Sequence, residues 1–175
     1  MQAPRFNLEL KARCRNLDAA REAAIRLGAR PVGVLIQEDT YFPASAGRLK
    51  LRLIQGESAE LIFYERPNDP AVRASRYLRV PVPDPVSLKA ALAAALGVSS
   101  VVRKHRHLLR WQNVRIHLDL VEDLGSFVEF EAVLSDDEHE DASRRRLEQL
   151  TEALKIPPDD RLAGSYGELI SSKTT

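Results

Sequence analysis

Charged residues alternate with apolar residues along six segments of this 175-residue sequence. In each segment, every second residue is mostly aliphatic, and the charged residues lie at the positions between. The charged positions are Glu9, Lys11 and Arg13; Lys50 and Arg52; Glu60 and Arg66; Lys104 and Arg106; Arg115 and Asp119; and Glu129 and Glu131. Arginine and lysine bind phosphate oxygens, whereas carboxylates bind hard divalent cations. The two sets together predict a site for a polyphosphate with Mg²⁺ or Mn²⁺.

A second interpretation of the same pattern is an open sheet whose charged side faces water. In that case Glu129 and Glu131, the clearest metal candidates, are two solvated glutamates. If the sheet instead closes into a barrel with its helices outside, the charged faces line the interior. Buried charges are stable only when they are paired or bind a ligand of opposite charge, so charges of both signs inside a barrel indicate an anion together with a cation.

Alternation with a period of two is typical of β-strands, because successive side chains of a strand point to opposite faces. Strands are expected at residues 6–13, 32–42, 48–54, 59–66, 75–82, 98–109, 113–121 and 127–134. Helical spacing and capping residues predict helices over 17–27, 86–96 and 143–156, the second of which is apolar enough to pack on the sheet. We therefore expect one α+β domain, with an eight-stranded, mostly antiparallel barrel and helices packed outside it.

Composition excludes several classes of protein. There are 26 Lys and Arg residues against 25 Asp and Glu, so no excess of positive charge indicates nucleic acid as a partner. No apolar run reaches the ~20 residues of a membrane span, and no signal peptide is recognisable at the start. A single cysteine, Cys14, forms no internal disulfide. We expect a cytoplasmic protein that does not bind membranes.

Six segments resemble the CYTH superfamily, the triphosphate tunnel metalloenzymes that include class IV adenylyl cyclases and thiamine-triphosphatase-like enzymes. They are NLELK at 7–11, GRLKLR at 47–52, LIFYERP at 61–67, VRKHR at 102–106, VRIHLD at 114–119 and LGSFVEFE at 124–131. The resemblance spans about residues 5–170 of a single domain over 1–175, and it is strongest to the bacterial cyclase-like branch. It implies an eight-stranded tunnel that binds a small-molecule triphosphate and a divalent metal.

The resemblance also assigns roles to individual residues. The phosphate ligands it implies are Lys11, Lys50, Arg52, Arg66, Lys104, Arg106 and Arg115, with Arg13 and Arg73 as additional contacts. The metal ligands it implies are Glu9, Asp119, Glu129 and Glu131, with Glu60 as a weaker member. Catalytic roles fall to Glu9, Lys11 and Asp119. By analogy with the family, Ser165 and Tyr166 plug one mouth of the tunnel, and the chain forms a homodimer.

One position departs from the family. Its signature Glu-x-Glu-x-Lys begins here with Asn7, which removes one negative charge from the site. Triphosphate hydrolysis and cyclisation of ATP both fit the remaining residues, and Asn7 favours a non-catalytic triphosphate-binding module as the alternative. Phe6, Tyr77 and Trp111 are candidates to stack on a base, although packing is the simpler role for each. His117 shares a strand face with Arg115 and is a weaker candidate to reach the tunnel.

Overall fold

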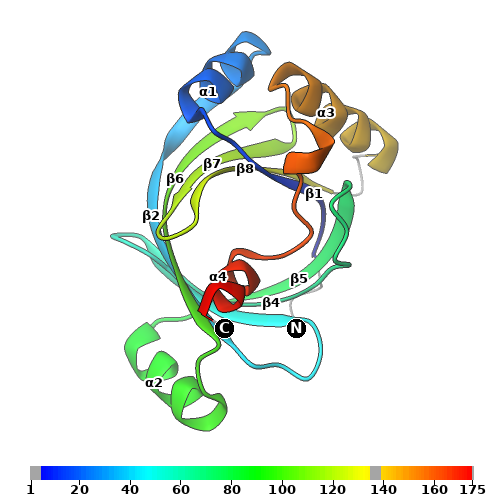
Figure 1. The fold of residues 1–175 in the computed structure, drawn as a ribbon. Coiled ribbons are helices and arrows are strands. Elements are labelled where there is room, and N and C mark those ends of the chain that lie inside the picture. The colour runs from blue at the N-terminus through cyan, green and yellow to red at the C-terminus, as the bar shows by residue number, and fades with distance from the viewer. Residues whose placement is uncertain (1–4, 135–138, 175) are drawn as a thin grey trace.

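The computed structural model describes residues 5–134 and 139–174. Eight strands close into one barrel in the order β1-β5-β4-β3-β2-β6-β7-β8, and all neighbouring strands are antiparallel (Figure 1). The strands are β1 (Arg5–Arg13), β2 (Arg30–Phe42), β3 (Arg48–Ile54), β4 (Ser58–Glu65), β5 (Arg73–Pro81), β6 (Ser100–Trp111), β7 (Val114–Val121) and β8 (Gly125–Val133). The eight-stranded antiparallel barrel expected from the sequence is confirmed.

Strand β1 closes the barrel, because it pairs with β5 on one side and with β8 on the other. Its alternation separates two buried environments. Leu8 and Leu10 face outward into the hydrophobic core, whereas Glu9 and Lys11 face the lumen. A strand buried on both faces thus keeps a strict alternation because one of its faces is charged.

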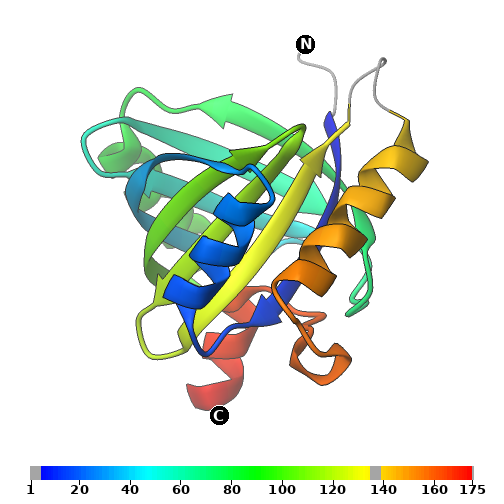
Figure 2. The same ribbon diagram turned by 90° about the horizontal axis from the view of Figure 1, so that it is seen from above.

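Two helices cover the outer wall formed by β1, β7 and β8 (Figures 1 and 2). They are α1 (Leu17–Arg26) and α3 (Glu140–Ala153). Ala24 of α1 and Leu147 of α3 are fully buried in the core that also contains Leu10 and Ile116. The side chain of Asn16 caps α1 by accepting a hydrogen bond of 2.9 Å from the backbone N–H of Ala19. The main hydrophobic core therefore lies between the barrel and these helices, and this arrangement leaves the lumen free for polar groups.

Helix α2 (Pro85–Leu96) lies against β2 and β3, as its apolar composition predicts, and Lys89 pairs there with Glu38 at 2.6 Å. The packing is shallow, because none of its residues is buried and Val86 is 76% exposed. The helix lies beside the barrel, outside the wall that α1 and α3 cover (Figure 1). Asp84 and Pro85 specify the start of the helix, as expected, but local capping does not determine how a helix packs.

The C-terminal segment returns to the barrel after the turn η1 (Pro158–Asp160) and crosses one end of it as α4 (Tyr166–Thr174) (Figure 1). The backbone N–H of Leu162 donates to the carbonyl of Lys11 at 2.9 Å. An ion pair of 2.8 Å joins Arg48 of β3 to Glu168 of α4. These contacts hold α4 at the end of the barrel where β1 finishes. No helix in the described part of the chain is both long and apolar enough to span a membrane.

Candidate functional site

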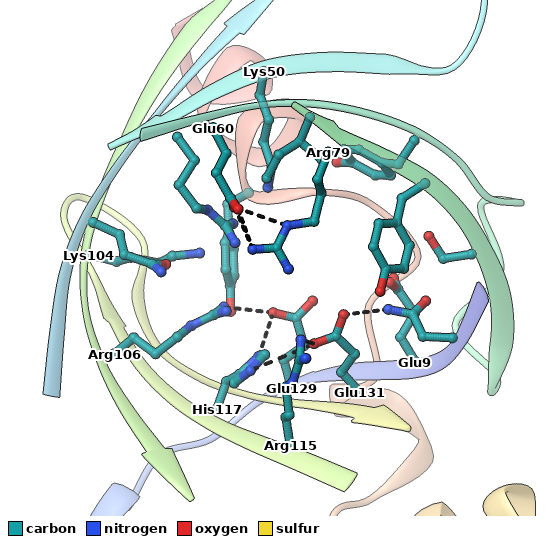
Figure 3. A pocket seen from close by; sticks show the side chains of 18 of the residues that line it. Glu9, Lys50, Glu60, Arg79, Lys104, Arg106, Arg115, His117, Glu129 and Glu131 are labelled. Carbon is teal, nitrogen blue, oxygen red and sulfur yellow. Dashed lines mark hydrogen bonds and ion pairs between the residues drawn. The ribbon is translucent and has the colours of Figure 1, made fainter. Parts of the chain in front are cut away.

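The barrel encloses a cavity of about 400 Å³ that follows its lumen (Figure 3). Among the described residues, eight lysines and arginines line this cavity against four glutamates. The cationic residues are Lys11, Lys50, Arg52, Arg66, Arg79, Lys104, Arg106 and Arg115, and the acidic residues are Glu9, Glu60, Glu129 and Glu131. The lining thus has a formal excess of four positive charges in a chain whose net charge is +1. A cavity of this charge is suited to a multivalent anion.

The structure brings most of the predicted site residues together. All seven residues expected to bind phosphate line the cavity, as do Glu9, Glu129, Glu131 and Glu60. Three do not, namely Arg13, Arg73 and Asp119. Strand parity explains the agreement: along a regular strand of a closed barrel every second side chain faces the lumen, so residues two apart lie on one wall.

Exposure rises along the lumen from one end to the other. The side chain of Lys104 is 2% exposed and that of Arg106 is 5% exposed, whereas the side chains of Arg79 and Arg115 are each 34% exposed. The buried end is the one that α4 crosses, and Tyr166 of α4 lines the cavity there. The tunnel therefore opens to solvent at the end where Arg79 and Arg115 lie.

Asp39 of β2 organises the buried end, although the sequence analysis did not select it. Its carboxylate accepts hydrogen bonds from Lys50 Nζ at 3.0 Å and from Arg52 at 2.8 Å, and it lies 3.7 Å from Lys104 Nζ. Burial alone would raise the pKa of Asp39, but Arg52, Lys50 and Lys104 hold it well below its usual value. Asp39 is therefore ionised and fixes three of the expected phosphate ligands.

Lysines at this end are costly to charge. Burial, reinforced by Arg52, lowers the pKa of Lys50 to about 8 despite its pairing with Asp39. Burial and the neighbouring Arg106 lower the pKa of Lys104 well below 10.5. A bound anion would stabilise the charged form of both side chains, so binding of an anion and protonation of the lysines are coupled.

Asp119 occupies a different place from the one expected of a metal ligand. Its side chain is completely buried, accepts two hydrogen bonds from Arg106 at 2.6 and 2.7 Å, and accepts a third from the Tyr166 hydroxyl at 2.9 Å. Burial would raise its pKa, but Arg106 and Lys104 lower it to about 2. These partners occupy the carboxylate, and the residue does not line the cavity, so in this structure Asp119 positions Arg106. The catalytic and metal-binding roles that the resemblance implies for Asp119 stay predictions.

Glu9 lines the cavity but is held by two arginines. Its carboxylate lies 3.1 Å from Arg66 and 3.3 Å from Arg73. Arg73 also donates to the backbone carbonyl of Leu162 at 2.9 Å, so it fastens the C-terminal segment instead of facing a ligand. Arg13 lies beyond the cavity, with its guanidinium 5.6 Å from the ring centre of Phe127. Neither of the two additional phosphate contacts expected from position alone lines the cavity.

The open end contains an ion pair and apolar surface. Arg79 of β5 donates to both carboxylate oxygens of Glu60 at 2.5–3.0 Å and points toward the middle of the lumen (Figure 3). Tyr77 lines the cavity, together with Leu35, Ile54, Ile62 and Leu108. Of the other aromatic candidates, Phe6 is 49% exposed and Trp111 packs against the outer core. Tyr77 alone of the three is placed to contact a ligand.

A third group lies on the wall formed by β1, β7 and β8. Glu129 and Glu131 point into the lumen beside His117 (Figure 3). Burial would raise the pKa of Glu129, but Lys11, His117 and Arg106 hold it well below its usual value. Burial and Arg106 lower the pKa of His117, so its imidazole is neutral near pH 7. His117 is only a weaker candidate from its position in the sequence, yet the structure places it beside both glutamates expected to bind metal.

The donor set on this wall fits a divalent metal. Glu129 and Glu131 supply carboxylate oxygens, and Asn7 Oδ1 is buried without a hydrogen-bond partner in the described structure. In those same residues, no three His, Cys, Asp or Glu side chains already converge on one point. Arg106, at 2.8 Å from Glu129, and Arg115, at 3.2 Å from Glu131, neutralise the carboxylates instead. The residues are suited to a metal that displaces Arg106 and Arg115 from the two carboxylates.

Tyr166 was expected near a tunnel mouth only from the resemblance. Its ring lies 3.7 Å from Lys11 Nζ, measured to the ring centre, and packs against Phe127 at 5.0 Å. Its hydroxyl reaches Asp119, and burial raises the pKa of that hydroxyl well above 10. Tyr166 therefore forms the floor of the cavity and holds a neutral polar group against the buried carboxylate.

The fold and the site together define a class of protein: a closed antiparallel barrel with a charged lumen that is positive overall. The family model for the CYTH domain matches residues 5–166 of this chain. The chain belongs to the CYTH domain family, which confirms the resemblance seen in the sequence. The CYTH domain is that of the triphosphate tunnel metalloenzymes, which implies a divalent metal.

Three similar proteins illustrate the family. A Methanocaldococcus jannaschii protein named "Putative adenylate cyclase" is 25% identical over 172 residues, covering 94% of this chain and 98% of its own. The structure of the PH1012 protein from Pyrococcus horikoshii superposes with a TM-score of 0.81 at 25% identity, covering 93% of this chain and 98% of the other. A Hippeastrum protein, titled a putative adenylyl cyclase with a dominant triphosphatase activity, shares the fold with a TM-score of 0.66 at 14% identity, covering 98% and 96%.

Proposed function

We propose that this protein is a divalent-metal-dependent enzyme that acts on a triphosphate bound in the lumen of its barrel. The observation that carries the proposal is the excess of lysine and arginine along a single cavity with one buried end. Cations enclosed at low dielectric attract an anion strongly, and their repulsion for one another disfavours the empty state. A triphosphate with its metal offsets this excess.

The chain's residues would divide the work along the tunnel. Lys50, Arg52 and Lys104, which converge on Asp39, would hold the terminal phosphate at the buried end. Lys11, beside the Tyr166 floor, would hold phosphate oxygens at the buried end as well, and Arg115, whose side chain is 34% exposed, would hold them nearer the opening. Fixed guanidinium and ammonium groups bind the phosphoryl oxygens and stabilise the charge that develops on them during transfer.

A metal held by Glu129 and Glu131, with Asn7 as a neutral oxygen ligand, would neutralise the phosphate oxygens further and act as a Lewis acid. Two reactions fit this arrangement. In hydrolysis, water attacks the terminal phosphorus, the bond from that phosphorus to the bridging oxygen breaks, the diphosphate leaves, and orthophosphate forms. In cyclisation, the ribose 3′-hydroxyl of ATP attacks the α-phosphorus, and pyrophosphate leaves. The names of the relatives include both adenylate cyclase and triphosphatase activity, so both reactions are retained.

A non-catalytic triphosphate-binding module is the second candidate, and Asn7 is the observation that favours it. The family's motif has a glutamate at this position, so the metal site here has one fewer carboxylate. A site with weaker metal binding can still hold the phosphates through the eight cationic side chains. Both candidate functions require the protein to bind a triphosphate, but only the enzyme converts it to product.

One set of incubations separates these functions. The protein is supplied with ATP, inorganic triphosphate or thiamine triphosphate, each with Mg²⁺ or Mn²⁺. Cyclic AMP with pyrophosphate indicates cyclisation, orthophosphate indicates hydrolysis, and ligand-induced thermal stabilisation without product indicates a binding module. Lys11→Ala and Glu129→Gln should abolish any turnover. If both variants retain full activity, the lumen is not the active site.

A further inference from the structure

His117 and Asn7 face the same pair of glutamates from opposite sides. In the pairing of β7 with β8, His117 lies directly across from Glu129. Its Nδ1 is 3.6 Å from Glu129 Oε2, and its Nε2 is 4.0 Å from Glu131 Oε2. On the other side, the Asn7 side-chain amide donates a hydrogen bond to Glu131 Oε1. Four side chains with metal-binding atoms thus share one wall of the lumen.

Two atoms in this group lack the hydrogen bonds that buried polar atoms normally make. Asn7 Oδ1 and His117 Nδ1 have no hydrogen-bond partner within the described residues, and the two side chains line the cavity. Asn7 is 3% exposed and His117 is 6% exposed, so bulk water is largely excluded from both. An unsatisfied amide oxygen and a neutral imidazole, which has a lone pair on one ring nitrogen, lie beside two carboxylates and mark a place where a cation would bind.

We propose that His117 is a metal ligand and that, with Asn7, Glu129 and Glu131, it forms a mixed nitrogen and oxygen site in this chain. The inference rests on the proposed function in so far as that function includes a divalent metal. It adds the identity of a nitrogen donor and, with it, the class of metal that the site prefers.

The chemistry of the donors sets that preference. Mg²⁺ binds oxygen ligands in regular octahedral geometry, whereas imidazole binds first-row transition dications well. An imidazole and a neutral amide here accompany only two carboxylates, so the site offers Mg²⁺ little advantage. We therefore expect Mn²⁺ to bind more tightly than Mg²⁺. To ligate the metal, Glu129 must turn away from Arg106 and Glu131 from Arg115, which frees both arginines for the phosphates.

The chain offers a matched control for His117. His107 lies on neighbouring β6 but faces the outside of the barrel and is exposed. It does not line the cavity. Replacing it changes the histidine content equally without touching the proposed site.

The test uses the whole protein with MnCl₂ and no triphosphate, so it does not depend on turnover. Pulsed electron paramagnetic resonance of bound Mn²⁺ should show nitrogen hyperfine coupling from a coordinated imidazole. His117→Ala should remove this coupling and weaken Mn²⁺ binding about tenfold or more, since even a group that only supports a ligand is worth 10–100-fold. His107→Ala should change neither quantity. His117→Gln serves as a second variant if the alanine variant does not fold.

Three results would overturn the proposal. They are bound Mn²⁺ without nitrogen coupling, unchanged Mn²⁺ affinity in both His117 variants, and no Mn²⁺ binding by the wild-type protein. The first two would leave the proposed function intact if triphosphate turnover with metal is still observed. Conversely, nitrogen coupling in a protein that does not turn over any triphosphate would retain the metal site and remove the proposed activity.

Discussion

The carboxylate of Asp39 lies 3.0 Å from Lys50 Nζ and 2.8 Å from Arg52 at the buried end of the tunnel. Two cations expected to bind phosphate thus already have an anionic partner. A buried carboxylate with three cationic neighbours compensates part of their charge and stabilises the fold without a ligand. A phosphate group that reaches this end must share these cations with Asp39.

Asp39→Asn should therefore have opposite effects on the stability of the fold and on the affinity for triphosphate. Removing the charge leaves Lys50, Arg52 and Lys104 less compensated, so we expect the free energy of unfolding to fall by about 3–5 kcal/mol without ligand. Inorganic triphosphate should bind more tightly than in the wild type, because the competing carboxylate is gone. Thermal unfolding with and without triphosphate measures both effects. Weaker binding by a folded Asp39→Asn protein would show that Asp39 aligns the cations for the ligand.

Binding should depend on pH through Lys50. Its pKa of about 8 in the free protein lies below the usual value of 10.5, so the side chain loses its charge as the pH rises through 8. An anionic ligand favours the charged form, so binding above pH 8 takes up a proton and the affinity falls as the pH rises. Calorimetry of triphosphate binding at pH 7 and pH 9, in buffers of different ionisation enthalpy, measures this uptake.

Lys50→Arg provides the control, because arginine stays charged throughout this range. The titration of the triphosphate itself is common to both proteins and cancels in the comparison. The arginine variant should show a flatter pH dependence and less proton uptake than the wild type. Identical pH profiles for the two proteins would mean that Lys50 does not titrate near 8 or does not sense the ligand.

Asn7→Glu restores the glutamate of the family's motif beside Glu131. Without metal, the new carboxylate replaces a hydrogen-bond donor with a like charge, and we expect a loss of about 1–3 kcal/mol in unfolding free energy. With Mn²⁺ or Mg²⁺, the variant should recover this loss and bind metal more tightly than the wild type. Asn7→Ala, which removes the donor without adding charge, should lose stability but gain no metal affinity. Equal metal affinity in all three proteins would show that the missing carboxylate does not limit the site.

Tyr166→Phe removes the hydroxyl that donates to Asp119 and keeps the ring that packs against Phe127. A hydrogen bond to a charged group is worth about 1.5–3 kcal/mol, so we expect destabilisation of that size in urea unfolding. Tyr166→Ala should cost more, because it also removes the floor of the cavity. Should the phenylalanine variant match the wild type in stability, Arg106 alone would satisfy Asp119.

The sequence predicted the barrel and most of the lumen because alternation is a local property. In segments such as 48–54, every second residue is charged, so one parity had to face a polar environment. The same reasoning selected Arg115 and Glu131, which come together at 3.2 Å. Alternation does not distinguish residues that line the cavity from residues that support it. Asp119 and Arg73 lie on the same strand faces as cavity-lining residues, but they are covered by other side chains.

The missed residues had weaker local signals. Asp39 follows Glu38 in a strand that begins with apolar residues on both faces. The alternation therefore gives little indication of which face of this strand lines the lumen. The alternate residues Gln37, Asp39 and Tyr41 are nevertheless all polar. Arg79 lies two residues after Tyr77 and four after Ser75, so the alternation of β5 places all three on the lumen face. No local pattern predicts that Tyr166 reaches Asp119, 47 positions earlier in the chain, because that contact depends on how the C-terminal segment crosses the barrel.

Calorimetric titration of inorganic triphosphate into matched arginine variants tests the central claim most directly. Arg115 faces the lumen and pairs with Glu131 at 3.2 Å, whereas Arg76 lies on the outer face of β5 and pairs with Glu65 at 3.3 Å. We predict one triphosphate per chain, binding about tenfold or more weaker in Arg115→Gln, and unchanged binding in Arg76→Gln. Equal affinities for Arg115→Gln and the wild type, or no binding by the wild type, would contradict a triphosphate site in the lumen.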